Sequence, residues 1–270
     1  MQAEWFMDID VINSLVSMYA KHSYLEDAQT MFTHTSKKNM VTWNAMVSAV
    51  AEEHGYYKKG ALQFLEQMQC EGVFPDNITF INSLSSCTQP LDLAEGKRMH
   101  VYLRYSGFDM DIVVVTSLIS MYGRCLDVLN AKKVFKQMTC YNVISWNAMI
   151  DAYIHNDLGK DAIDVFIKMQ SLGLHPNKST FVSVLSACMM EATLTIGRHI
   201  HFWIVSSGYD DHIALGSALM QMYAKCGCIE DAYKPNNQAL LKDLISWNTV
   251  ISSYAQHGCG NEALHLYDHM

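Results

Sequence analysis

The chain has 270 residues, half of them hydrophobic, which is enough to bury a sizeable core. It contains only 4 prolines and 14 glycines, which disfavours a β-sandwich with many turns and favours regular helices. The formal net charge of −8 weighs against a protein that holds nucleic acid mainly by phosphate attraction, because such a protein needs a basic surface.

The 8 cysteines lie far apart and no secretory signal precedes them, so we expect a reducing compartment and no disulfide framework. No apolar run approaches the roughly 20 residues that span a bilayer, so we expect no membrane partner. The first residues resemble neither a signal peptide nor an Arg- and Ser-rich transit peptide.

Three short motifs recur along the chain. In chain order they are the heptapeptides beginning at Asn13, Thr116 and Ser217, those beginning at Val41, Ile144 and Ile245, and the nonapeptides beginning at Thr79 and Thr180. The tryptophans of the second set, Trp43, Trp146 and Trp247, are 103 and 101 residues apart. This period divides into three related units of 31 to 37 residues, which is typical of a repeat architecture.

Each unit is predicted to form two helices. In the segment 143–177, apolar residues follow the i, i+3, i+4, i+7 spacing of one helix face at Trp146, Met149, Ile150 and Tyr153. A turn follows at 156–159, and a second apolar stripe comprises Ala162, Phe166 and Met169 before the helix-stop residues Gly173 and Pro176. One hairpin cannot bury its own apolar face but stacked hairpins can, so the predicted fold is an all-α solenoid.

These units resemble pentatricopeptide repeats, because they have about 35 residues, an Asn shortly before an aliphatic run, and a Gly-x-x-Pro-[Asp/Asn] ending. The alternating unit lengths are similar to those of the plant subclass that cycles P, L and S repeats. The resemblance implies a right-handed superhelix. Tetratricopeptide repeats have a similar length, but their Trp…Leu-Gly…Tyr pattern does not recur here.

By this resemblance, residues 1–8 end a preceding L unit. The following units are, in chain order, 9–39 (S), 40–76 (P), 77–111 (L), 112–142 (S), 143–177 (P), 178–212 (L), 213–243 (S) and a partial unit 244–270 (P). We expect Pro235 to break or delay the second helix of the unit 213–243, since proline costs about 3 kcal/mol inside a helix. Small insertions are expected near Glu52 and Lys58, because the unit 40–76 is the longest.

The resemblance assigns base selection in RNA to the fifth and last residues of a unit. The carried-over pairs are Asn13 with Asn39, Asn44 with Asp76, Thr116 with Asn142, Asn147 with Asn177, and Ser217 with Asp243, while Asn248 lacks a partner. All are short polar side chains with defined donors and acceptors, which base edges require. The competing interpretation is that these residues only cap helices. It is weakened if Thr42, Ser145 and Ser246 are the N-caps, as we expect.

Two further groups follow from the same resemblance. The aliphatic second residues Val41, Val113, Ile144 and Ile245 would sandwich the bases, whereas Asp10 breaks this pattern. The cations Lys21, Arg124 and Lys225, each thirteenth in its unit, would contact the RNA backbone. The three recurrent tryptophans are expected to pack in the core, because they lie on the apolar stripe.

The expected function is sequence-selective binding of single-stranded RNA, about one base per repeat. The resemblance further implies the specificity module of an RNA editing or processing factor in a mitochondrion or chloroplast, with other editing-complex proteins as additional partners. The family's pairing rules, with the L-unit pairs Ile81/Asp111 and Val182/His212 left open, predict 5′-pyrimidine, U, any, A, pyrimidine, any, G-3′. The alternatives are a protein-interaction scaffold with little RNA contact and a degenerate copy without a partner.

No enzymatic activity is expected. The His-x-Glu and Cys-x-x-Cys ligands of a cytidine-deaminase-like domain are missing from this sequence, and the pair at Cys226 and Cys228 lacks common zinc spacing. We expect no metal, no other cofactor and no small-molecule substrate. The repeat-equivalent cysteines at 87 and 188, and at 125 and 226, are explained by packing.

Overall fold

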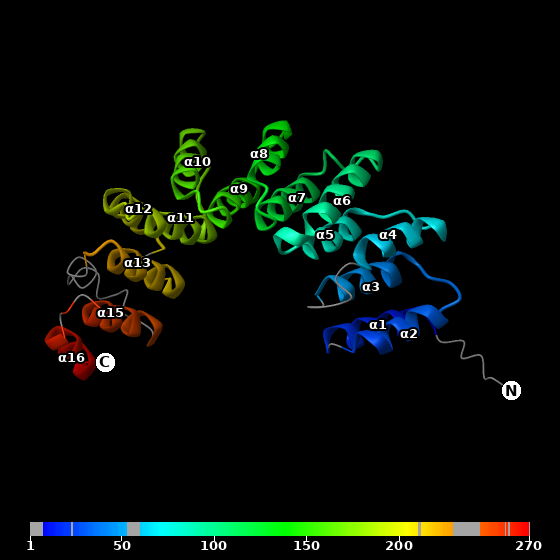
Figure 1. The fold of residues 1–270 in the computed structure, drawn as a ribbon, viewed down its shortest axis with the longest axis horizontal. Helices are drawn as coiled ribbons and strands as arrows, with labels where there is room; N and C mark the ends of the chain where they lie inside the picture. Colours follow the sequence, from blue (N-terminus) through cyan, green and yellow to red (C-terminus); the bar gives the residue numbers. More distant parts are fainter. Residues whose placement is uncertain are drawn as a thin grey trace. The chain divides into compact units, whose positions relative to one another are not determined.

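A computed structural model describes residues 8–22, 24–52, 60–209, 212–228, 244–256, 258 and 260–269. Within these residues the regular structure is helical and contains no strand, as expected. The chain forms two compact units, Met1–Tyr141 and Asn142–Met270, each built from successive helical hairpins (Figure 1). The expected N-terminal tail at 1–7, the insertions at 53–59 and the segment around Pro235 lie outside the described residues.

In the compact unit Met1–Tyr141, the first helices of four repeats stack on one another, and each is followed by the second helix of its own repeat. Its helices are α1 (Ile9–Lys21), α2 (Leu25–His34), α3 (Met40–Glu52), α4 (Gly60–Cys70), α5 (Asn77–Ser85), the 3-10 turn η2 (Pro90–Asp92), α6 (Leu93–Tyr105), α7 (Ile112–Arg124) and α8 (Val128–Gln137). The first helices pack in series, α1 on α3, α3 on α5 and α5 on α7. One layer of the unit therefore consists of first helices alone.

The second unit repeats this arrangement. Its helices are α9 (Val143–His155), α10 (Gly159–Ser171), α11 (Lys178–Glu191), α12 (Leu194–Ser206), α13 (Ile213–Lys225), α15 (Leu244–Gln256) and α16 (Gly260–His269). Again the first helices contact one another in turn, α9 with α11, α11 with α13 and α13 with α15.

The core contains the apolar stripes that the sequence predicts. Trp43 is fully buried and meets Phe32 edge-on, with 4.7 Å between ring centroids. Trp146 is 2% exposed, and Phe166 of α10 is fully buried near Phe181 of α11. Core packing is thus confirmed for Trp43 and Trp146, whereas Trp247 is half-buried.

Helix capping corrects one expectation. Thr42 and Ser145 are not N-caps: the side-chain oxygens of Asn39 and Asn142 accept from their backbone N–H groups at 3.0 and 2.8 Å. In return, the hydroxyl oxygens of Thr42 and Ser145 accept from the backbone N–H groups of Asn39 and Asn142. Each pair forms a capping box, in which the last residue of one unit starts the first helix of the next. The side chain of Ser246 lies outside the described part.

Candidate functional site

The fifth and last residues of a unit lie next to each other in three places. Asn44 Nδ2 donates to the Asp76 carboxylate, at 3.2 Å from Oδ1 and 3.3 Å from Oδ2. Asn147 Nδ2 donates to Asn177 Oδ1 at 3.2 Å, and Asn13 Nδ2 approaches Asn39 Oδ1 at 3.5 Å. Each contact joins a first helix to the cap of the next first helix, 26 to 32 residues further along the chain.

A threonine hydroxyl completes each of these pairs. The third residue of the following unit is Thr42, Thr79 or Thr180, and all three are fully buried. Their Oγ1 atoms donate to the side-chain oxygens of Asn13, Asn44 and Asn147 at 2.7, 2.6 and 2.7 Å. We call each set of fifth residue, last residue and threonine a polar triad. Sequence reasoning missed the threonines, because Thr42 was assigned to capping and the equivalent Thr79 and Thr180 were overlooked.

The fifth asparagines are more enclosed than a surface site implies. Asn13 and Asn147 are each 7% exposed, whereas Asn44 is half-buried. Among the last residues, Asn177 is exposed, and Asn39, Asp76 and Asn142 are half-buried. The fifth side chain is therefore held by its neighbours, and the last side chain is the more accessible member of the pair.

Asp76 is held in its ionised form. Burial raises its pKa, but hydrogen bonds from the Thr79 backbone N–H, the Thr79 hydroxyl and the Asn44 amide outweigh burial and bring the pKa below its usual value. An ionised carboxylate only accepts hydrogen bonds, so Asp76 differs in kind from an asparagine at the same place.

For the other expected base-selecting residues, the structure describes single side chains and not a pair of fifth and last residues. Thr116 and Ser217 are 8% and 9% exposed, and their hydroxyls donate to the carbonyl oxygens of Ile112 and Ile213 in their own helices. Thr116 and Asn142 lie in different compact units, and Asp243 lies outside the described residues. Asn248 is exposed on α15.

The aliphatic second residues of several units are exposed. Val41, Val113 and Ile144 are 57%, 52% and 63% exposed, each on the first turn of a first helix. Ile78, which holds the same place in the unit 77–111 and was overlooked in the sequence, is 52% exposed. The side chain of Ile245 is not described.

The three expected backbone cations differ in environment. Lys21 and Lys225 are exposed in the last turns of α1 and α13. Arg124 is half-buried and donates from Nε to the Cys87 carbonyl and from Nη2 to the Leu84 carbonyl, both at 3.2 Å. These carbonyls lie at the C-terminal end of α5, where intrahelical partners run out.

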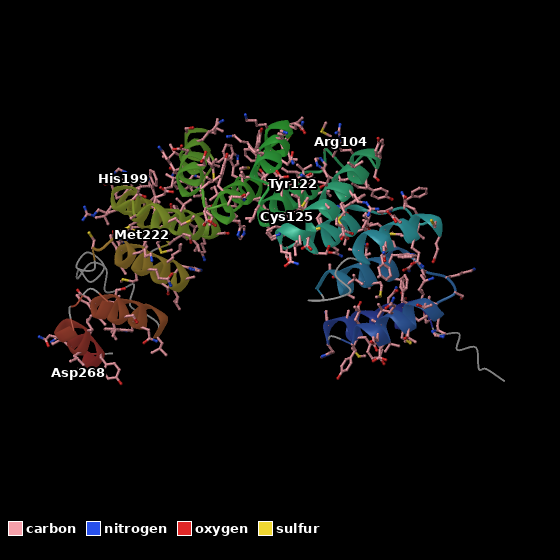
Figure 2. All side chains as sticks on the ribbon, viewed as in Figure 1. Arg104, Tyr122, Cys125, His199, Met222 and Asp268 are labelled. Atoms are coloured by element: carbon pink, nitrogen blue, oxygen red, sulfur yellow. The ribbon has the colours of Figure 1, made fainter. Side chains whose placement is uncertain are left out.

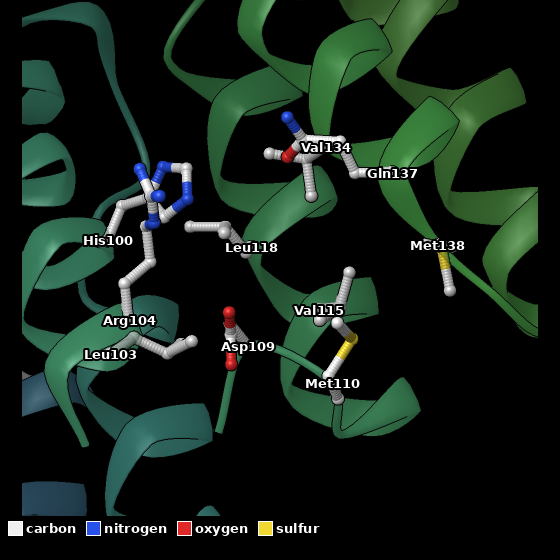
Figure 3. Close-up of a pocket in the computed structure, with 10 residues that line it drawn as sticks. All are labelled: His100, Leu103, Arg104, Asp109, Met110, Val115, Leu118, Val134, Gln137 and Met138. Carbon is white, nitrogen blue, oxygen red and sulfur yellow. The ribbon is translucent and has the colours of Figure 1, made fainter. Parts of the chain in front are cut away.

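Other features do not form a second site of the expected kinds. Cys87, Cys125 and Cys188 are buried, as packing predicts, whereas Cys226 is half-buried. Cys125 directly follows α7, near Tyr122 of that helix (Figure 2). In the described ranges, three or more His, Cys, Asp or Glu side chains nowhere gather as metal ligands would. None of the helices described there has the length and apolar character needed to cross a membrane. A pocket between α6, α7 and α8, lined by His100, Arg104, Asp109 and apolar side chains, contains none of the expected site residues (Figure 3).

Stacked hairpins with paired polar residues on their first helices define a helical-repeat protein. Comparison with known families identifies the repeat. The profile described as PPR repeat matches residues 11–39, 113–143 and 245–270, and the one described as PPR repeat family matches 141–190. The segments that these profiles match are pentatricopeptide repeats.

Known pentatricopeptide repeat proteins match almost the whole chain. A chloroplastic one of Arabidopsis thaliana is 36% identical over 263 residues, which are 97% of this chain and 32% of the relative. A mitochondrial one from the same plant is 33% identical over 260 residues, which are 96% of this chain and 40% of the relative. The chain therefore spans only about a third to two fifths of such proteins.

Solved structures show the same fold. The pentatricopeptide repeat protein PPR10 from maize superposes with a TM-score of 0.78 at 19% identity, over 97% of this chain and 38% of PPR10. PPR10 in complex with an 18-nt psaJ RNA element gives a TM-score of 0.60 at 19% identity, over 96% of this chain and 49% of that one. The predicted all-α repeat solenoid is thereby confirmed.

Proposed function

We propose that this chain binds single-stranded RNA in a sequence-selective manner, with about one base per repeat. The observation that carries the proposal is the polar triad, which presents a fixed set of donors and acceptors at repeated places. Exposed aliphatic side chains at Val41, Ile78, Val113 and Ile144 supply apolar surfaces near the start of the same helices. The RNA bound to PPR10 supports this function for a protein of the same fold.

The last residues of different triads offer different hydrogen-bonding groups and therefore favour different bases. Asn177 Oδ1 already accepts from the Thr180 N–H at 2.9 Å and from Asn147 Nδ2, so its amide group chiefly offers donors. Donors suit cytosine, which has an acceptor at N3. Asp76 offers only acceptors and suits uracil, which carries a hydrogen on N3. These preferences fit the heptamer 5′-pyrimidine, U, any, A, pyrimidine, any, G-3′.

We further propose a biological role and a cellular location for this RNA binding. The division into P, L and S units would make this chain the specificity module of an RNA editing or processing factor. Chloroplastic and mitochondrial relatives support an organellar site of action. Sequencing organellar transcripts from an organism that lacks the gene should show a lost editing event or an altered transcript end near this heptamer. Unchanged transcripts in both organelles would contradict this role.

Exchanging the two kinds of last residue tests base selection directly. We expect Asp76→Asn to change the preferred second base of the heptamer from U to C, with a change in the affinity ratio of about tenfold or more. The reciprocal change Asn177→Asp should convert the fifth base from C to U. Asparagine and aspartate cap helices equally well, so both variants should keep the fold.

Fluorescence anisotropy with synthetic heptamers measures these ratios, and circular dichroism checks the helices. A scrambled heptamer provides the baseline for the unchanged chain. Equal affinity for the heptamer and the scrambled RNA would contradict sequence-selective binding and favour the scaffold. Selective binding that both exchanges leave unaltered would contradict the assigned pairs.

A further inference from the structure

The three triad threonines have a role that capping does not explain. In each capping box the threonine oxygen accepts from the N-cap N–H, at 3.3 Å for Thr42 and 3.1 Å for Thr79 and Thr180. Capping therefore uses the oxygen as an acceptor. The hydroxyl hydrogen has two acceptors within reach: the side-chain oxygen of the N-cap residue, at 2.9, 2.7 and 2.9 Å, and that of the fifth asparagine, at the shorter distances of 2.7, 2.6 and 2.7 Å. We propose that this hydrogen makes Thr42, Thr79 and Thr180 positioning residues, which fix the amide orientation of the fifth asparagine and so set its base selectivity.

Geometry at Asn147 shows how the orientation is fixed. Thr180 Oγ1 lies 2.7 Å from Asn147 Oδ1, closer than its 2.9 Å separation from Asn177 Oδ1. On the other side, Asn147 Nδ2 lies 3.2 Å from Asn177 Oδ1. Rotating the amide by half a turn would bring two oxygen acceptors together there and leave the threonine hydrogen only the longer contact with Asn177 Oδ1. Both neighbours therefore favour the same orientation.

The same arrangement is present at Asn44. Thr79 Oγ1 lies 2.6 Å from Asn44 Oδ1 and 2.7 Å from Asp76 Oδ1, and Asn44 Nδ2 faces the Asp76 carboxylate. A rotated Asn44 would place its oxygen against a negative charge. Since one amide hydrogen binds Asp76, the second hydrogen remains as a donor whose direction is set by the threonine.

Ser145 shows that a capping-box hydroxyl need not act in this way. It is fully buried and holds the same third place at the start of α9. Its oxygen accepts from the Asn142 N–H, but its hydrogen is donated to the Asn142 backbone carbonyl at 2.8 Å. Ser145 therefore provides a natural contrast, with the same cap and a different destination for the hydrogen.

This inference rests on the proposed RNA binding. It adds the threonine, beside the fifth and last residues, as a third determinant of base choice wherever the fifth residue is asparagine. With Thr180 replaced by valine, Asn147 keeps only its contact with Asn177 and gains access to other orientations. An amide that turns offers either a donor or an acceptor, and therefore accepts both cytosine and uracil. The expected defect is lost discrimination and not simply lost affinity.

The experiment compares three variants on heptamers that differ only in C or U at the fifth base. We expect Thr180→Val to lower the ratio of affinities for C and U by about three- to tenfold, the value of one buried hydrogen bond. Thr180→Ser keeps the hydroxyl and should keep the ratio. Ser145→Ala removes a capping-box hydroxyl from the same unit and should lower the melting temperature while leaving the ratio unchanged.

The possible outcomes distinguish a failure of the positioning role from a failure of the proposed RNA binding. An unchanged chain that does not distinguish the heptamers contradicts the proposed function itself. A selective chain whose Thr180→Val variant has the same ratio, or loses affinity equally for both bases, overturns the positioning role alone. If Thr180→Val does not fold, Thr79→Val is compared at the second base, where the freed Asn44 amide should change the ratio of affinities for U and C and an unaltered ratio would overturn the role.

Discussion

Arg124 is the residue whose environment departs most from its expected role. Its guanidinium links α7 to the end of α5 through the Leu84 and Cys87 carbonyls. A cation at a helix C-terminus interacts favourably with carbonyl groups that lack intrahelical partners. Lys21 and Lys225 hold the same place in their units but are exposed. Arg124 therefore joins two first helices.

We expect Arg124→Ala to lower the free energy of unfolding by about 2 kcal/mol, because two carbonyl groups lose charged donors. Lys225→Ala should change it by less than about 0.5 kcal/mol, as is usual for an exposed side chain. Urea denaturation followed by circular dichroism measures both. Similar small effects for the two variants, with weaker RNA binding for Arg124→Ala alone, would show that phosphate contact is its main role.

At the scale of elements, the second helices of the repeats 77–111 and 178–212, α6 and α12, pack closely on the next first helices, α7 and α13. On α6, a Cβ added to Gly96 would lie 2.4 Å from Met121 Sδ, and Gly197 and Met222 repeat this arrangement in α12 and α13. Beside these glycines, His100 Nδ1 lies 2.8 Å from the Tyr122 hydroxyl, and His201 Nδ1 lies 2.9 Å from the Tyr223 hydroxyl. Each junction thus combines a close helix approach with one partly buried polar contact.

These junctions should weaken in acid. Burial lowers the pKa of His100, nearby Arg104 lowers it further, and Asp109 opposes them; burial also lowers the pKa of His201. Below the unfolded pKa of about 6.5, the unfolded chain binds more protons than the folded chain, so stability falls as pH falls toward the folded pKa.

We therefore expect a larger loss of unfolding free energy between about pH 7.5 and pH 5.5 for the unchanged chain than for a His100→Gln, His201→Gln double variant. Urea titrations at a series of pH values measure the difference, and the carboxylates common to both chains cancel. Parallel pH profiles for the two proteins would contradict a contribution from these histidines.

At the scale of the whole molecule, the net charge of −8 limits how RNA can be bound. Only three cations occupy the place assigned to backbone contact, and Arg124 is already bound to protein carbonyls. In the proposed RNA complex, affinity therefore comes mainly from the triads and the exposed aliphatic residues, which involve little counterion release.

We predict a shallow salt dependence for the heptamer. Three phosphate contacts give a slope of log K against log salt of about −2, so affinity should fall by no more than about 20-fold between 0.05 and 0.2 M salt. Anisotropy titrations at several salt concentrations measure the slope. A slope steeper than about −4 would indicate a basic surface that the assigned residues do not supply.

The sequence by itself determined the repeat, the helical hairpins and the buried stripes. These depend on local periodicity, and recurrence of each pattern at equivalent places reinforces it. It also identified Asn44 with Asp76 and Asn147 with Asn177, although only through resemblance to a known repeat. Their proximity is now a structural fact, whereas their contact with bases remains a proposal.

Only the tertiary structure decided where the polar hydrogens go. Thr79 and Thr180 donate to asparagines 35 and 33 residues earlier, and Arg124 reaches carbonyls 37 and 40 residues earlier. Such contacts exist only after neighbouring first helices have packed, and no local pattern distinguishes Thr180 from Ser145. The physical reason is that a hydroxyl rotates to its best available acceptor, and stacking decides which acceptor is within reach.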